Sequence, residues 1–345
     1  LADTTSISHV SPELISLSYR GYPVHELAEK CSFEEVAYLI WYGELPNHQQ
    51  LETFCRQERK KRCVSEWMLK SIEALPSETH PMDRLITGIS QLALEDRTRA
   101  DSSPLANLEK AMRLTAAIPT LIAADYRIRM GRKPIPPDKS LSFAENFLFM
   151  CFGKKPQKAI LDAFEASLIL YAEHTFNAST FAARVIASTL SDIYSAVIGG
   201  VSAIKGSLHG GANEDVMHML NDIGDAKNAI PWLRENIRLK RKIPGFGHRV
   251  YKKGDSRYRI MKKQFRELSE ECGIQKWFQI GTMLEAYRIE NKKNHPNLDL
   301  LLTDFNGNPV RFNMTAGQKE ALRAFFATLT DSVMLNDEKF SDPFK

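Results

Sequence analysis

The chain has 345 residues, of which 43% are hydrophobic and 26% are charged, and its formal net charge is +4. This length and composition are typical of a globular protein with a large core, and they favour a division into two domains. So small a positive charge argues against a nucleic-acid-binding protein but suits anionic metabolites. No stretch of about 20 residues is both predominantly apolar and uncharged, which argues against a membrane span.

The cysteines favour a reducing compartment. There are five, an odd number, and they are scattered without a C-x-x-C, zinc or haem-attachment pattern. The first residues also lack the basic region, apolar run and cleavage site of a secretory signal. We therefore expect a soluble cytoplasmic protein with structural thiols and no bound metal.

In chain order, a turn-rich aromatic segment at residues 17–23 predicts a short N-terminal hairpin, and the pattern turns helical from Val24. Ser32 followed by Glu35 predicts a capping box for the first long helix. Ser179 or Thr180 is the predicted N-cap of the helix at residues 181–190. Apolar residues then recur at helical spacing through most of the chain. The predicted helices cover residues 33–42, 47–64, 65–75, 81–94, 106–129, 141–152, 158–175, 181–190, 193–204, 215–221, 226–240, 257–272, 275–292 and 315–330. No stretch shows sustained period-2 alternation or a β-α-β rhythm, so we expect an all-α fold.

Residues 205–214 are the most distinctive stretch. An apolar run of small residues stops at Gly206, His209 follows, and two glycines then precede a helix for which Asn213 is a suitable N-cap. Glycine admits positive φ and leaves room for a ligand beside the backbone. A histidine at such a junction suits proton chemistry on a small substrate, but it suits a turn without a chemical role equally well.

Four further residues stand in settings that suit chemistry. His174 ends a predicted buried helix, and His248 lies in a Pro/Gly loop followed by cations, which suits phosphates or carboxylates. Arg257 could bind a carboxylate bidentately. Asp299 is flanked by leucines, and such a setting can raise the pKa of a carboxyl group so that it acts as a base.

Structural explanations compete with each of these. A single histidine is more often structural than catalytic, Lys252 suits a solvated surface, and Asp299 could cap a helix or turn. Gly245-Phe246-Gly247 is only a G-x-G without a preceding strand, which is weak evidence for a dinucleotide site. The chain also lacks a phosphate-binding loop and a G-x-S-x-G nucleophile elbow. The residues alone indicate a helical two-domain protein and leave open whether it is an enzyme with anionic ligands.

A series of motifs is more specific. In chain order they are Tyr19-Arg20-Gly21-Tyr22, Phe33-Glu34-Glu35-Val36-Ala37, Gly43-x-Leu45-Pro46, His80-Pro81-Met82-Asp83, Tyr171-Ala172-Glu173-His174, Ser179-Thr180, Leu208-His209-Gly210-Gly211-Ala212-Asn213-Glu214, Gly245-Phe246-Gly247-His248-Arg249-Val250-Tyr251 and Pro296-Asn297-Leu298-Asp299. In these motifs and their order the chain resembles the citrate synthase family, and within it the bacterial 2-methylcitrate synthases.

The resemblance implies condensation of an acyl-CoA with oxaloacetate, followed by thioester hydrolysis, without a cofactor beyond the CoA thioester substrate. It implies that Asp299 removes a proton next to the thioester carbonyl, that His209 stabilises the enol, and that His248 polarises and protonates the oxaloacetate ketone. It further implies that His174 and Arg257 hold oxaloacetate carboxylates. The residues that it implies for CoA binding are Gly245, Phe246, Gly247, Arg249 and Lys252.

The resemblance also implies a homodimer with a citrate-synthase-like architecture. A large helical domain of residues 1–208 would be followed by a smaller helical domain of residues 209–300 that closes over the active site and keeps water from the thioester. Residues 301–345 would return to the large domain as an atypical tail, because they lack the arginine motifs that end the family's chains.

The predicted function is therefore the condensation of propionyl-CoA with oxaloacetate and water to give 2-methylcitrate and CoA, with acetyl-CoA accepted more slowly. Two alternatives stay open. One is a citrate synthase that uses acetyl-CoA, since one methylene group in an acyl pocket is worth only about 1–3 kcal/mol. The other is a catalytically impaired homologue, because the C-terminal segment is replaced.

Overall fold

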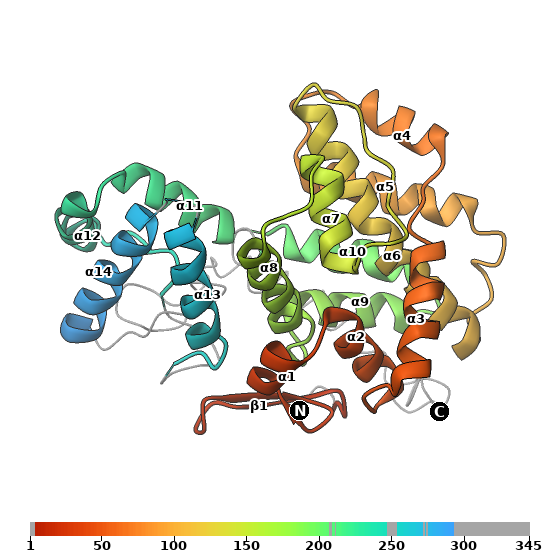
Figure 1. Cartoon of the computed structure of the whole chain (residues 1–345), viewed down its shortest axis with the longest axis horizontal. Coiled ribbons are helices and arrows are strands. Elements are labelled where there is room, and N and C mark those ends of the chain that lie inside the picture. Colours follow the sequence, from red (N-terminus) through yellow and green to blue (C-terminus); the bar gives the residue numbers. More distant parts are fainter. Residues whose placement is uncertain are drawn as a thin grey trace, which may run out of the picture.

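The computed structural model describes residues 4–206, 209–210, 212–246, 254–271, 273 and 275–292. Within these residues the protein is predominantly helical, which confirms the predicted all-α class (Figure 1). The helices are α1 (Val24–Lys30), α2 (Phe33–Tyr42), α3 (His48–Lys60), α4 (Glu66–Glu73), α5 (Pro81–Glu95), α6 (Pro104–Arg129), α7 (Phe143–Phe152), α8 (Lys158–Tyr171), α9 (Ala178–Ser188), α10 (Ile193–Ile204), α11 (Ala212–Ile223), α12 (Ala229–Arg238), α13 (Tyr258–Glu271) and α14 (Gln275–Lys292), with a 3₁₀ turn, η1 (Ala226–Asn228), before α12.

A small antiparallel sheet precedes the helices. β1 (Ser8–Ser11) pairs with β2 (Ser16–Tyr19), which also pairs with β3 (Tyr22–Pro23). Leu17 and Tyr19 of β2 are buried, since alternate side chains of a strand point to the same face. The aromatic segment that predicted a hairpin forms β2 and β3, whereas β1 was not predicted.

Two apolar clusters join seven of the first ten helices. One joins the sheet to α1, α2 and α8 and includes Tyr19 and Ile169. The other joins α4, α5, α6 and α10 and includes Ile89 and Leu121. A Cβ atom at Gly88 of α5 would lie 3.0 Å from the Leu121 side chain of α6, so the glycine lets these two helices pack closely.

The helices after residue 211 build a core of their own. Leu220, Leu233 and Ile280 are buried in a cluster formed by α11, α12 and α14, and Figure 1 shows this group apart from the first ten helices. α13 lies between the group and α8 and contacts both α8 and α14. This separate core lies within the part of the chain predicted as the smaller domain. Its predicted boundaries at residues 209 and 300 stay predictions, and the tail of residues 301–345 lies outside the described residues.

The end of α8 differs from the prediction. The helix ends at Tyr171, whereas the apolar spacing predicted a helix to residue 175. The Tyr19 hydroxyl lies 3.0 Å from the carbonyl oxygen of Ile169 and 3.3 Å from that of Leu170. In a continued helix those carbonyls would accept from the amides of residues 173 and 174. His174 therefore lies in the connector between α8 and α9 instead of in a helix.

The starts of two other helices were also predicted wrongly. Asn177 caps α9, because its Oδ1 accepts the backbone N–H groups of Ser179 and Thr180, the two residues predicted as caps. Both residues consequently lie in the first turn of α9. α11 begins one residue before Asn213, so this predicted N-cap lies inside the helix.

Candidate active site

His209 lies in the junction that follows α10. Its backbone N–H donates to the Gly206 carbonyl at 2.8 Å, and the Gly210 N–H donates to the Ile204 carbonyl at 2.9 Å. A Cβ atom at Gly210 would lie 2.6 Å from the Ile204 carbonyl oxygen. A side chain at this position would therefore displace the turn, and the glycine fixes the backbone that carries His209.

The His209 ring reaches the first turn of α9. Its Nε2 lies 2.8 Å from Ser179 Oγ, which in turn lies 2.6 Å from Asn177 Oδ1. Since Asn177 Oδ1 already accepts two backbone N–H groups, the serine hydroxyl donates to it and accepts from the ring. Ser179 thus orients the imidazole and places a proton on Nε2. The sequence predicted Ser179 as a helix cap and as part of a motif, but it did not predict this contact with His209.

Arg257 is buried just before α13 and is held by its own loop. Its Nε and Nη2 donate to the two Asp255 carboxylate oxygens at 3.0 and 2.9 Å, and its backbone N–H also donates to Asp255. The exposed fractions of these side chains are 2% and 0%. A pair this deeply buried costs desolvation and is held in place by its bidentate geometry. The sequence predicted Arg257 as a carboxylate ligand but did not predict its pair with Asp255.

Three of the predicted residues lie along or beside the connector between α8 and α9. At its start, the Tyr171 ring lies 5.9 Å from the Arg257 guanidinium. His174 is half-buried in its middle. Just beyond its far end, in the first turn of α9, Ser179 contacts His209. A hollow of about 380 Å³ lies beside the start of the connector and is lined by Phe33, Ser167, Leu168, Tyr171 and Ala172.

Of the predicted CoA-binding residues, the structure describes Gly245 and Phe246. Gly245 has φ +84°, where a side chain would be strained, and it lies against Val216. Phe246 is buried in the core of α11, α12 and α14, with the Arg288 guanidinium 5.6 Å from its ring. Any contact that Phe246 makes with CoA therefore comes from its backbone. The remaining predicted site residues, Gly247, His248, Arg249, Lys252 and Asp299, lie outside the described residues.

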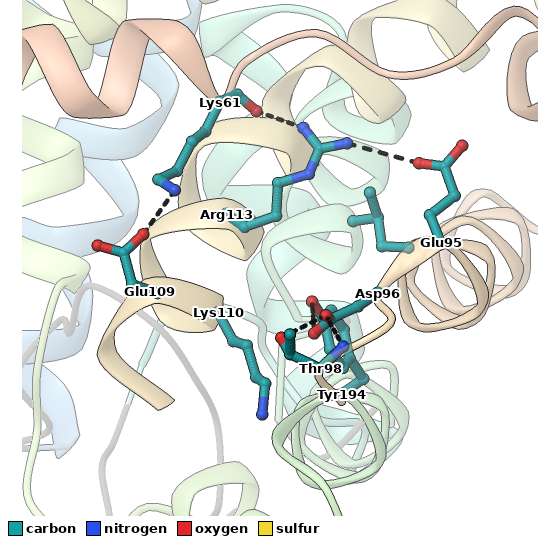
Figure 2. Close-up of a pocket in the computed structure, with 9 residues that line it drawn as sticks. Lys61, Glu95, Asp96, Thr98, Glu109, Lys110, Arg113 and Tyr194 are labelled. Carbon is teal, nitrogen blue, oxygen red and sulfur yellow. Dashed lines mark hydrogen bonds and ion pairs between the residues drawn. The ribbon is translucent and has the colours of Figure 1, made fainter. Parts of the chain in front are cut away.

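A second cavity, of about 370 Å³, lies among α3, α5, α6 and α10, and none of the predicted site residues lines it. Figure 2 shows two ion pairs among its charged side chains. Lys61 pairs with Glu109 at 2.6 Å and Arg113 with Glu95 at 3.7 Å. This pairing across the cavity leaves its charges balanced, which does not favour an ionic ligand.

Comparison with a solved structure defines the class of fold. A ternary complex of carboxymethyl coenzyme A and oxaloacetate with citrate synthase from Thermoplasma acidophilum superposes with a TM-score of 0.80 at 32% identity, covering 86% of this chain and 79% of that one. The fold is therefore that of the citrate synthases.

Sequence comparison gives the family. The family model "Citrate synthase, C-terminal domain" matches residues 1–303. A 2-methylcitrate synthase from Mycobacterium tuberculosis is 52% identical over 299 residues, covering 87% of this chain and 76% of the relative. A citrate synthase from Mycolicibacterium smegmatis is 50% identical over 299 residues, covering 87% and 80%. The chain belongs to the citrate synthase family. The family match ends at residue 303, in agreement with the predicted departure of the C-terminal segment.

Proposed function

We propose that this protein condenses propionyl-CoA with oxaloacetate and hydrolyses the product thioester, releasing 2-methylcitrate and CoA. Membership of the citrate synthase family supports condensation of an acyl-CoA with oxaloacetate, and the 52% identity to a 2-methylcitrate synthase supports the propionyl group. The observation that carries the proposal is the connector between α8 and α9, which joins the neighbourhoods of His174, His209 and Arg257.

Oxaloacetate would bind between His174 and Arg257. A buried guanidinium is a strong ligand for a carboxylate because it offers several N–H donors in a fixed plane. Asp255 uses Nε and Nη2 of Arg257 and so fixes the direction of the whole group. The bidentate pair also keeps the cation charged and oriented in a site from which water is excluded.

The condensation needs a base, an acid and a group that stabilises the enol. Asp299 would take the proton from the carbon beside the thioester carbonyl, and His209, oriented by Ser179, would stabilise the oxygen on which negative charge develops. That carbon then forms a bond to the ketone carbon of oxaloacetate, while the ketone oxygen takes a proton from His248. Water finally cleaves the thioester, which releases the CoA thiol.

CoA would bind along residues 245–253. Gly245, Gly247, Arg249 and Lys252 would contact it, and Phe246 would contribute its backbone. The smaller domain would close over oxaloacetate before CoA chemistry begins, which shields the thioester from water. The reaction needs no metal or further cofactor, because proton transfers and a stabilised enol account for every step.

We include a homodimer in the proposal. α9 buries none of its residues within the described part of the chain. Phe181 and Val185 on this helix remain 50% and 46% exposed. Large apolar side chains exposed on one face of a helix are expected to be covered by a partner, and a second copy of this chain would cover them in a symmetric pair. A cytoplasmic location stays a prediction.

A thiol-release assay on the purified protein, with oxaloacetate and either propionyl-CoA or acetyl-CoA, tests the function. We expect a higher kcat/KM for propionyl-CoA. A preference for acetyl-CoA would establish the second candidate, a citrate synthase, which the 50% identity to an enzyme of that name supports. No CoA release with either substrate would overturn both and would indicate an impaired homologue.

A further inference from the structure

The N-terminal sheet holds the connector that carries His174. Tyr19 is fully buried, and its hydroxyl lies within hydrogen-bonding distance of the last carbonyls of α8. The same oxygen lies 3.4 Å from the Glu173 backbone nitrogen, which donates to it. The strand β2 therefore sets the residue at which α8 ends and the direction in which the chain leaves the helix.

Glu173 ties the next turn to β1. Its Oε1 accepts the Ser8 hydroxyl at 2.9 Å and the Thr175 backbone N–H at 2.6 Å. The Thr175 N–H also lies 3.0 Å from Ser8 Oγ. One carboxylate oxygen thus links the residues on either side of His174 to a strand more than 160 positions away in the sequence.

The backbone here would not keep this shape by itself. Thr175 has φ +54°, a left-handed conformation that a β-branched residue rarely adopts. The bond from its N–H to Glu173 closes a tight turn around His174. Burial raises the pKa of the Glu173 carboxyl, while its bonds from Ser8 and Thr175 and the charge of Arg20 act in the opposite direction.

The same sheet also touches the loop that carries Arg257. The Ile15 side chain, in the turn between β1 and β2, lies 3.7 Å from where a Cβ atom of Gly254 would stand. Gly254 directly precedes Asp255, the partner of Arg257. Ile260 and Met261 of α13 pack against the cluster that contains Tyr19. The sheet therefore contacts both segments that bear the predicted oxaloacetate ligands.

We propose that Glu173 is a positioning residue for oxaloacetate binding: clamped by Ser8 of the N-terminal sheet, its carboxylate fixes the turn that aims the His174 ring at a substrate carboxylate. This rests on the proposed function, in which His174 is the ligand. Glu173 itself does not touch the substrate. Misplacement of a ligand by about 1 Å can cost on the order of 100-fold in rate, so support of this kind has a measurable effect.

Steady-state kinetics on four variants tests the inference. Glu173→Ala should raise the KM for oxaloacetate by about tenfold while the KM for acyl-CoA stays within about twofold. Glu173→Gln should recover most of that loss, because its amide oxygen can accept both bonds that Oε1 accepts. Ser8→Ala should have a smaller effect in the same direction. Ser11→Ala, in the same strand but away from Glu173, should match the wild type.

A purely structural role gives a different pattern. Loss of stability alone would lower the concentration of active enzyme and leave both KM values unchanged, and that result in Glu173→Ala would overturn the proposal. If Glu173→Ala does not fold, the comparison of Ser8→Ala with Ser11→Ala decides, and equal KM values for oxaloacetate in the two would refute it.

His174→Ala separates this inference from the proposed function. If that variant leaves the KM for oxaloacetate unchanged, His174 is not the ligand and the proposed role of His174 fails. If His174→Ala raises this KM but the Glu173 and Ser8 variants do not, the positioning role alone fails. In the His174→Ala background, adding Glu173→Ala should change the oxaloacetate KM no further, whereas additive effects would contradict an action through His174.

Discussion

Glu165 of α8 makes the stability of the protein depend on pH. Its Oε1 accepts the Phe33 backbone N–H at 2.5 Å, at the start of α2. Burial raises the pKa of this carboxyl from its ordinary value of 4.5 to about 7, and the negative charges of Glu34, Asp162 and Glu35 act in the same direction. The folded state therefore favours protonated Glu165, and ionisation of this carboxyl group lowers the free energy of unfolding.

The expected size of this pH effect on stability follows from the ordinary pKa of the Glu165 carboxyl and its pKa in the folded protein. Because the native pKa is the higher one, the stabilisation by bound proton is fully present below pH 4.5 and is lost as the pH rises through about 7. With about 1.4 kcal/mol for each pKa unit, ionised Glu165 lowers the free energy of unfolding by about 3 kcal/mol at pH 8 and above. Glu165→Gln should remove this loss, since the amide oxygen keeps the bond to Phe33 and carries no charge.

Urea unfolding of both proteins at several pH values between 5 and 9 measures the effect. We expect the stabilities of Glu165→Gln and wild type to diverge through pH 7, with the variant more stable by about 3 kcal/mol on the alkaline side. Glu66→Gln is the matched control, because Glu66 is 80% exposed and pairs with Lys70 at the surface. Parallel curves for wild type and Glu165→Gln across this range would refute the reasoning.

Three further predictions concern the site and the dimer. Asp255→Asn should lower the free energy of unfolding by about 3–5 kcal/mol, because it leaves the Arg257 charge buried without its carboxylate, and should also raise the KM for oxaloacetate; an unchanged unfolding midpoint would contradict the buried pair. Ser179→Ala should lower kcat by about tenfold with little effect on the oxaloacetate KM, since it removes the acceptor that orients His209; an unchanged kcat in steady-state assays would exclude that role. Phe181→Glu should convert the proposed dimer to a monomer in sedimentation velocity, since it places a charge on the exposed face of α9, and a monomeric wild type would disprove the proposed interface.

Local signals in the sequence predicted most of the helices. The capping box of Ser32 and Glu35 is present at the start of α2, with both reciprocal bonds formed. α10 spans the predicted residues 193–204, because a run of small apolar residues followed by glycine specifies both its packing and its end. Interactions between residues a few positions apart decide such features, and a single sequence displays them.

The features that the sequence did not predict depend on distant partners. α8 stops at Tyr171 because Tyr19 takes its last carbonyls, and no pattern near residue 171 announces a hydroxyl from β2. Asn177, Ser179 and Thr180 are all residue types that suit an N-cap, so the local sequence did not identify Asn177 as the cap of α9. The buried pair of Asp255 and Arg257 is only two residues apart, but its burial comes from the packing of α13, which composition does not reveal.

The bond from Tyr19 to Ile169 spans 150 positions of the chain, which has a consequence for the order of folding. During synthesis from the N-terminus, β1 and β2 leave the ribosome long before the end of α8 exists. At about 5–20 residues per second they wait on the order of 10 s for their partner. Until then Leu17 and Tyr19 are an uncovered apolar strand surface, and exposed strands of this kind are prone to aggregation. The turn around His174 would thus be among the last parts of the first ten helices and their sheet to form. Its closure requires the N-terminal strands to meet the end of α8, which lies about 150 positions later in the chain.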